Sequence, residues 1–263
     1  MKYFVKTNSV KTVIALSCIG FLNTAGAKVF DFQSAVFAPY IKGTIGYTAV
    51  GQRAYENGSG ADTEFANTPL TNYSGEFGFM INIGNTVGLR IFLDVIQVNP
   101  MKSIPGKDAA GTSTYMDLTS TMVTYSPSVA AEFYLLKRPT SRLFVYGGLG
   151  LASTTLTNAY VVSAAGQAQY SINAEYTEKA VSSNINTIGG VGYEMLMSDT
   201  ATVAFDLGYR YLPITKMTHA ADGTTIAQGA VSKGDSLKNS NGDTRSFDLS
   251  TLYVGVAFRI YIQ

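Results

Sequence analysis

Residues 203–211 read Val203-Ala204-Phe205-Asp206-Leu207-Gly208-Tyr209-Arg210-Tyr211, with an apolar or aromatic side chain at every odd position. A period of two places successive side chains on opposite faces of a β-strand. Here one face is wholly apolar or aromatic, whereas the other carries Asp206 and Arg210. The stretch therefore predicts a strand whose two faces meet different surroundings.

The same alternation recurs along the chain. It is clean in residues 41–49, 73–81 and 87–95, and less regular in residues 129–135, 143–151, 185–195 and 252–260. Each segment has about nine residues, which is the length that a tilted strand needs to cross the hydrocarbon of a bilayer. Together with residues 203–211, the segments predict eight membrane strands.

Charged residues within these segments all lie on the polar face. They are Lys42, Glu76, Arg90, Asp94, Glu132, Glu194, Asp206, Arg210 and Arg259. A basic side chain facing lipid at mid-bilayer costs about 2–4 kcal/mol, so this bias is expected of a transmembrane barrel. Because the five acids and four bases nearly cancel, we interpret them as a static charge network filling a narrow lumen. A proton or ion path is the alternative.

The connections between the segments alternate in length. Residues 82–86, 136–142 and 197–201 are short, whereas residues 51–72, 97–120, 153–183 and 213–246 are long and polar. Short periplasmic turns opposite long external loops are typical of outer-membrane barrels. We therefore predict an all-β fold, an eight-stranded antiparallel up-and-down transmembrane β-barrel with four long extracellular loops.

Two features qualify the strand assignment. Pro127 cannot donate a ladder hydrogen bond, so we start the fourth membrane strand after it and expect residues 121–126 to continue above the membrane as a hairpin. Residues 153–183 are long enough to hold an extra hairpin, which leaves ten strands as an alternative.

Residues 1–27 have the pattern of a cleaved secretory signal peptide. Lys2, Lys6 and Lys11 precede an apolar stretch at residues 12–22, and Ala25-Gly26-Ala27 fits the cleavage rule. Residues 28–263 would then form the barrel. The one cysteine, Cys18, lies in the signal segment, so we expect neither a disulfide nor a metal site, and no cofactor, in the mature protein.

Composition excludes several classes of protein. Lys plus Arg number 19 and Asp plus Glu 18, which leaves no basic surplus for binding nucleic acid. Charged residues make up only 14%, against about 25% in ordinary soluble proteins. After residue 30 no apolar run reaches 18 residues, so the chain is not a polytopic helical membrane protein.

Three strand segments, at residues 144–150, 205–211 and 254–259, carry a resemblance to a known family. The chain resembles the small eight-stranded outer-membrane barrel proteins of Gram-negative bacteria, which include OmpX-like, OmpW-like and surface-antigen barrels. The resemblance implies a place in the outer membrane. It also implies contact with outer-membrane lipid and lipopolysaccharide, and insertion by the barrel-assembly machinery.

The expected function is that of a structural or surface-antigen barrel without catalysis, whose loops recognise a host or another cell. The alternative is a narrow channel for small or apolar solutes. Its motivation is a set of small inward positions, Gly148, Gly150, Ala152, Gly190 and Gly192, which could leave space beside the fifth and sixth strands.

A second alternative is an outer-membrane lipid-modifying enzyme. His219 is the one histidine, and Asp222, Ser232 and Ser236 follow it in the same loop. Such residues could form a nucleophilic set if the fold brought them together. A histidine in a loop is more often solvated, so we expect none of them to be catalytic.

Overall fold

A computed structural model describes residue 32 and residues 36–48, 71–84, 86–107, 113–239 and 242–262. All of them belong to one compact unit, Asp31–Gln263. The predicted signal peptide, residues 1–27, and most of the predicted loop at residues 51–72 lie outside the described residues.

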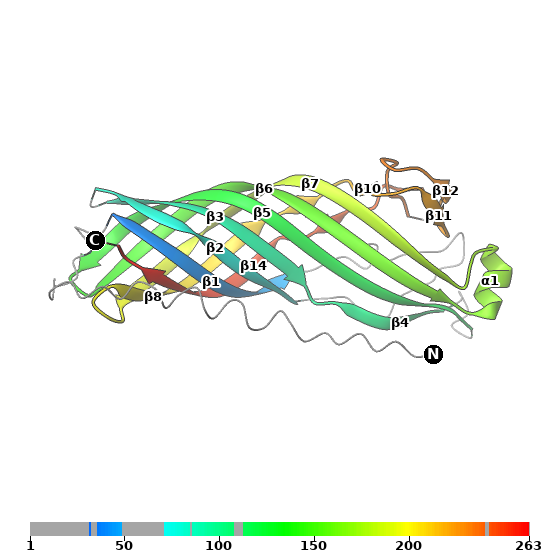
Figure 1. The fold of residues 1–263 in the computed structure, drawn as a ribbon, viewed down its shortest axis with the longest axis horizontal. Coiled ribbons are helices and arrows are strands. Elements are labelled where there is room, and N and C mark those ends of the chain that lie inside the picture. Colours follow the sequence, from blue (N-terminus) through cyan, green and yellow to red (C-terminus); the bar gives the residue numbers. More distant parts are fainter. Residues whose placement is uncertain are drawn as a thin grey trace. The chain divides into compact units, whose positions relative to one another are not determined.

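Eight antiparallel strands form a closed ring (Figure 1). They are β1 (Phe37–Thr48), β2 (Thr71–Ile83), β3 (Val87–Val98), β5 (Thr114–Arg138), β6 (Ser141–Val162), β7 (Glu175–Leu196), β8 (Ala201–Tyr211) and β14 (Thr251–Ile260). Each pairs with the next in this order, and pairing of β14 with β1 closes the ring. The prediction of an eight-stranded antiparallel barrel is confirmed.

The wall of the ring separates apolar from charged side chains, as the alternation predicted. Outward-facing Phe77, Phe205 and Leu207 are about half exposed, whereas Asp206 between the last two is buried. Aromatic side chains also face outward, including Tyr47 and Tyr209 towards one rim. A continuous apolar surface of this kind suits acyl chains and not water, so the barrel spans a membrane.

The two ends of the barrel differ. Short turns join β2 to β3, β5 to β6 and β7 to β8 at one end, which we call the turn end. The long connections leave from the other, the loop end. They hold β4 (Met101–Lys107), α1 (Ala164–Tyr170), β9 (Pro213–Ile214), β10 (Thr218–His219), β11 (Gly223–Thr225), β12 (Gly229–Val231) and β13 (Phe247–Asp248). No helix among the described residues is long and apolar enough to cross a membrane.

Three neighbouring strands continue far past the others at the loop end. β5 has 25 residues and β6 and β7 have 22 each, whereas about ten suffice to cross the hydrocarbon. Residues 97–120 and 153–183, predicted as polar loops, therefore consist largely of paired strand. Residues 153–183 form a hairpin with α1 at its tip, between β6 and β7. Ser163 caps α1 by accepting a hydrogen bond from the Gly166 amide. The hairpin lengthens β6 and β7 and adds no ninth or tenth strand to the ring.

β5 is continuous through Pro127, and residues 121–125 pair with β6 in a hairpin that prolongs the strand, as predicted for residues 121–126. Pro127 faces outward opposite Leu93 of β3. Next to Pro127 the ladder to β6 is interrupted between the pairs Tyr125–Ser153 and Ser128–Gly150, and its register shifts once more between Tyr134 and Leu136. A strand held on both sides over many residues tolerates the loss of one ladder hydrogen bond.

An apolar core fills the interior of the barrel towards the loop end. Its members from the strands include Ile96, Met122, Leu156 and Ala180. Residues 212–249, which we call the strap, contribute Leu212, Ile214, Met217, Leu237, Phe247 and Leu249 to the same core. The predicted loop at residues 213–246 thus packs its apolar side chains inward.

Candidate functional site

All nine charged residues predicted for the lumen are buried, with between 0% and 4% of their surface exposed. The structure adds a tenth, Arg142, which is 1% exposed and gives five bases against five acids. Arg142 was overlooked because it precedes the alternating segment predicted at residues 143–151. Its parity with the inward-facing Phe144 and Tyr146 was the signal that could have found it.

One cluster of these charges lies nearest the turn end. Nη2 of Arg259 is 2.6 Å from Oε1 of Glu132, and Nη1 is 2.9 Å from Oε2 of Glu194. Glu194 also accepts hydrogen bonds from Nε of Arg142, at 2.6 Å, from the Tyr261 hydroxyl, at 2.9 Å, and from Thr202. Both carboxylates are thus held by several donors, as buried charges require.

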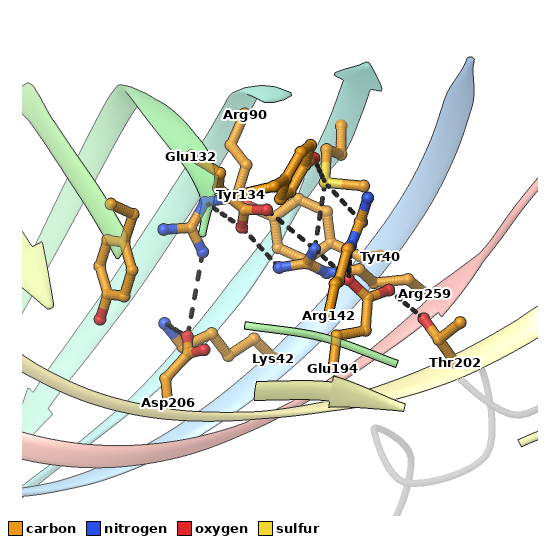
Figure 2. A network of polar contacts seen from close by, with 12 residues as sticks. Tyr40, Lys42, Arg90, Glu132, Tyr134, Arg142, Glu194, Thr202, Asp206 and Arg259 are labelled. Atoms are coloured by element: carbon orange, nitrogen blue, oxygen red, sulfur yellow. Dashed lines mark hydrogen bonds and ion pairs between the residues drawn. The ribbon is translucent and has the colours of Figure 1, made fainter. Parts of the chain in front are cut away.

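Arg90 joins this cluster to a second one (Figure 2). Its Nε is 3.3 Å from Glu132, and its Nη1 is 3.7 Å from Glu76 and 3.9 Å from Asp206. Nζ of Lys42 lies 2.6 Å from Asp206. The guanidinium of Arg90 also lies over the ring of Tyr146, with 4.5 Å to the centroid, which adds a cation–π contact.

Several ion pairs join strands that are diametrically opposite in the ring. β14 and β5 are four steps apart and are joined by Arg259 and Glu132. β3 and β8 are also four steps apart and are joined by Arg90 with Asp206 and by Asp94 with Arg210. Side chains that meet across the full diameter occupy the lumen between them.

A layer of hydroxyl and amide groups follows the charges towards the loop end. Thr44 and Ser74 hydrogen bond at 2.7 Å, Thr124 and Thr154 at 2.8 Å, and Asn72 donates to Thr251 at 2.8 Å. The apolar core comes next. The interior therefore changes along the barrel, from charged groups near the turn end, through hydroxyl and amide groups, to apolar packing near the loop end.

A further buried ion pair, apart from the lumen network, fixes the strap. Nη1 of Arg245 lies 2.9 Å from Glu178 of β7, and its Nε donates to Asn239 at 3.0 Å. Asn158 of β6 donates to the same carboxylate at 3.1 Å and accepts from Ser120 of β5 at 2.6 Å. Sequence reasoning missed this site because residues 213–246 were predicted as a polar loop.

Burial shifts the titration of the groups around this pair. Burial alone would lower the pKa of Arg245, but the facing Glu178 carboxylate outweighs it and raises that pKa above its ordinary value. Burial raises the pKa of Tyr160 well above its ordinary value, and the charge of Glu178 adds to the effect. These shifts favour a charged Arg245 and a neutral Tyr160.

The small inward positions beside the fifth and sixth strands of the ring are occupied by neighbouring side chains. A Cβ on Gly190 would lie 2.6 Å from the Tyr146 hydroxyl, and one on Gly192 would lie 2.6 Å from Oδ1 of Asp206 and against Phe144. Gly148 and Gly150 lie in the same way against β5, and Ala152 belongs to the apolar core. Gly190 and Gly192 thus make room for Tyr146 and Phe144, and Gly148 and Gly150 allow close approach to β5.

His219 does not meet the residues proposed for a nucleophilic set. It is 3% exposed, and its Nε2 lies 3.0 Å from Oε1 of Gln228. Among the described residues, no serine hydroxyl or carboxylate contacts the ring. Asp222 accepts from the Lys233 amide, and the Ser232 amide donates to Asp235. Ser236 contributes its carbonyl oxygen, which accepts from Nε2 of Gln228 at 3.0 Å.

A closed ring of eight strands, an outward apolar wall and a buried charge network define a small membrane-spanning β-barrel of the kind found in bacterial outer membranes. No family model matches the chain. A search of curated proteins also found no match.

Solved structures with a similar fold are outer-membrane and surface proteins. Ail, the attachment invasion locus protein of Yersinia pestis, is 12% identical, with a TM-score of 0.44 over 86% of this chain and 99% of that chain. OprG of Pseudomonas aeruginosa is 12% identical, with a TM-score of 0.46 over 90% and 100%. A major outer-membrane protein of Thermus thermophilus is 13% identical, with a TM-score of 0.46 over 85% and 99%. These similarities concern the fold alone.

Proposed function

We propose that the protein is a non-conducting, non-catalytic barrel of the outer membrane that displays a structured surface outside the cell. The observation that carries the proposal is the pairing of diametrically opposite strands across the lumen, by Arg259 with Glu132 and by Arg90 with Asp206. A barrel whose lumen is occupied by paired side chains leaves no path for solutes. It can still anchor an extracellular surface in the membrane.

The displayed surface is the extension formed by β4, β5, β6, β7, α1 and the strap. Strand pairing and the apolar core hold it in one conformation, which lowers the entropic cost of binding a partner. We propose that it recognises a ligand on a host or another cell. The signal peptide at residues 1–27 and insertion by the barrel-assembly machinery are parts of the same proposal.

Conductance tests the closed lumen most directly. The purified full-length protein, inserted in a planar lipid bilayer, should give no steady single-channel current. A variant in which Asp94 and Arg210 are both replaced by Ala keeps the lumen neutral and removes one pairing across it, so it provides the matched comparison. Steady current through the unaltered protein would overturn the proposal and favour the narrow channel.

Lipid analysis tests the absence of catalysis. Because the ring of His219 hydrogen bonds only to Gln228 among the described side chains, His219→Ala should leave the lipid A and phospholipid profiles of the producing cells unchanged. Gln228→Ala, which disturbs the same contact, is the control for a purely structural effect. A modified lipid that disappears in His219→Ala alone would assign an enzymatic role.

A further inference from the structure

The side chains of Lys42 on β1 and Asp206 on β8 reach each other across β14. Nζ of Lys42 is 2.6 Å from Oδ2 of Asp206, and both side chains are only 1% exposed (Figure 2). A nitrogen this close to a carboxyl oxygen lies within about 3.5 Å of the carboxyl carbon, which is the separation of reacting atoms in a near-attack geometry. The pair is therefore placed for bond formation as well as for charge pairing.

Two glycines clear the space in which this pair meets. The stem of Lys42 passes over Gly255 of β14, where a Cβ would lie 2.8 Å from Cε of the lysine. On the other side of Asp206, a Cβ on Gly192 of β7 would lie 2.6 Å from Oδ1. A larger residue at either position would displace one member of the pair, so the wall of the barrel is shaped to let the two side chains touch.

Glu76 provides a proton acceptor beside the pair. It lies opposite Lys42 in the ladder between β1 and β2, and its Oε2 is 3.5 Å from Nζ of Lys42. The Tyr40 hydroxyl donates a hydrogen bond to Oε1, which holds the carboxylate in place. A positioned carboxylate within reach of an amine can take up and return protons during a reaction at that amine.

The surroundings of the pair exclude water and activate the carboxyl group. The rings of Tyr146 and Tyr253 lie over Nζ of Lys42, with 5.5 and 5.1 Å to their centroids. Charges are costly in such a dry site, and proton transfer from the amine to the carboxylate removes both of them. Nη1 of Arg90 is 3.9 Å from Oδ2 of Asp206, where its positive charge stabilises negative charge that develops on the carboxyl oxygen.

We propose that Lys42 and Asp206 are joined by an intramolecular isopeptide bond. Nζ of the neutral amine attacks Cγ of the protonated carboxyl group, and Glu76 takes a proton from the nitrogen as the C–N bond forms. Glu76 then returns the proton to the departing hydroxyl group, the C–O bond breaks and one water molecule leaves. Nothing is oxidised or reduced, and no co-reactant is required. Enclosure of the product protects the amide from hydrolysis.

The bond fastens the seam at which the barrel closes. β1 and β14 are the first and last strands of the ring, and the link from β1 to β8 spans the β14 strand between them. One ion pair becomes a neutral amide, so the remaining bases and acids of the lumen stay equal in number. The reaction occurs once within the folded chain, so it is separate from any turnover of an outside substrate and from ligand binding by the extension.

Mass spectrometry of the protein, purified from membranes and then denatured, tests the inference. The unaltered mature chain should be lighter than its sequence by one water molecule. Proteolysis should release a branched peptide in which Lys42 is linked to Asp206. The boiled protein should also migrate faster in denaturing electrophoresis than an unlinked variant, because the closed loop keeps the unfolded chain more compact.

Three variants make the result specific. Lys42→Arg keeps the positive charge but has no nucleophilic amine, and Glu76→Gln keeps the side-chain shape but removes the proton acceptor. Both should fold, as judged by circular dichroism, and should have the full mass of their sequences. Asp94→Asn is the matched control, because it changes a lumen carboxylate that pairs with Arg210 instead, and it should still lose one water.

Three results would overturn the inference. The first is a folded, unaltered protein with the full mass of its sequence, which decides the matter even if a variant fails to fold. The second is a loss of water that persists in Lys42→Arg. The third is a branched peptide that joins Lys42 to Glu76 instead of Asp206. Conductance is measured separately, so current through the unaltered protein would refute the closed lumen and leave the isopeptide bond standing.

Discussion

Arg259 on β14 donates a hydrogen bond of 2.6 Å to Glu132 on β5, on the far side of the ring. The same guanidinium reaches Glu194 of β7 at 2.9 Å. One side chain therefore links three strands that are not neighbours of one another. Because the pairing joins opposite sides of the ring, its contribution to stability depends on the complete barrel.

Replacing Arg259 by Met should destabilise the barrel strongly. The change leaves the buried Glu132 and Glu194 without their shared partner, and removing one member of a buried pair costs about 3–5 kcal/mol. The free energy of unfolding, measured with urea in lipid vesicles, should fall by that amount. Arg138→Met, at the exposed end of β5, should change it little. Adding Glu132→Leu to Arg259→Met should recover part of the loss, and no recovery would contradict the pairing.

A charge on the outer wall should be costly at mid-barrel and tolerated near the rim. Leu207→Arg places a guanidinium against acyl chains at the middle of β8, which costs about 2–4 kcal/mol. Tyr211→Arg lies at the end of the same strand and should cost about 0–1 kcal/mol. The same vesicle assay measures both. Equal costs at the two positions would contradict the assignment of the outward face to lipid.

Alkaline stability should depend on Tyr160. Burial raises the pKa of this phenol in the folded protein, whereas in the unfolded chain it ionises near its ordinary value of about 10. The stability that Tyr160 contributes is therefore complete below about pH 10 and is lost as the pH rises beyond it. Tyr160→Phe keeps the ring that stacks on Tyr176 at 4.5 Å. The variant should lose less stability between about pH 9 and 12 than the unaltered protein, in thermal melts followed by circular dichroism.

The strap should loosen when its ion pair is broken. Glu178→Gln removes the charge that faces Arg245, 2.9 Å away. The amide of Arg245 donates to the Leu237 carbonyl, and the amide of Leu237 donates to the Met217 carbonyl. Hydrogen exchange at these two amides should speed up at least tenfold, because local opening becomes easier. The Phe205 amide in β8 is the internal control, and equal acceleration there would indicate global destabilisation.

The strands of the barrel were predictable because their two faces carry side chains of different chemistry. Phe205 and Leu207 require lipid as clearly as Asp206 and Arg210 require the lumen, so the ring and the burial of its charges follow from one pattern. The extension lacks this contrast, because Thr155 and Thr157 face outward while Thr154 and Asn158 face inward. Hydroxyl and amide side chains on both faces resemble a loop.

The strap was beyond prediction for another reason. Met217, Leu237 and Phe247 are far apart in sequence and become neighbours only when strands β3, β5, β6 and β7 offer them a common core. The pairing of Arg245 with Glu178 likewise joins a predicted loop to a position that sequence reasoning also assigned to a loop. Partners of this kind can be identified only from the folded chain.

The five bases and five acids within the lumen give it no net charge, which determines how the barrel responds to a voltage across the membrane. A voltage across a membrane does work on net charge, about 2.3 kcal/mol per elementary charge for 100 mV. With opposite signs matched at nearly the same depth, such a field exerts almost no net force on these side chains. Changes in transmembrane voltage should therefore not move the charged side chains of the lumen.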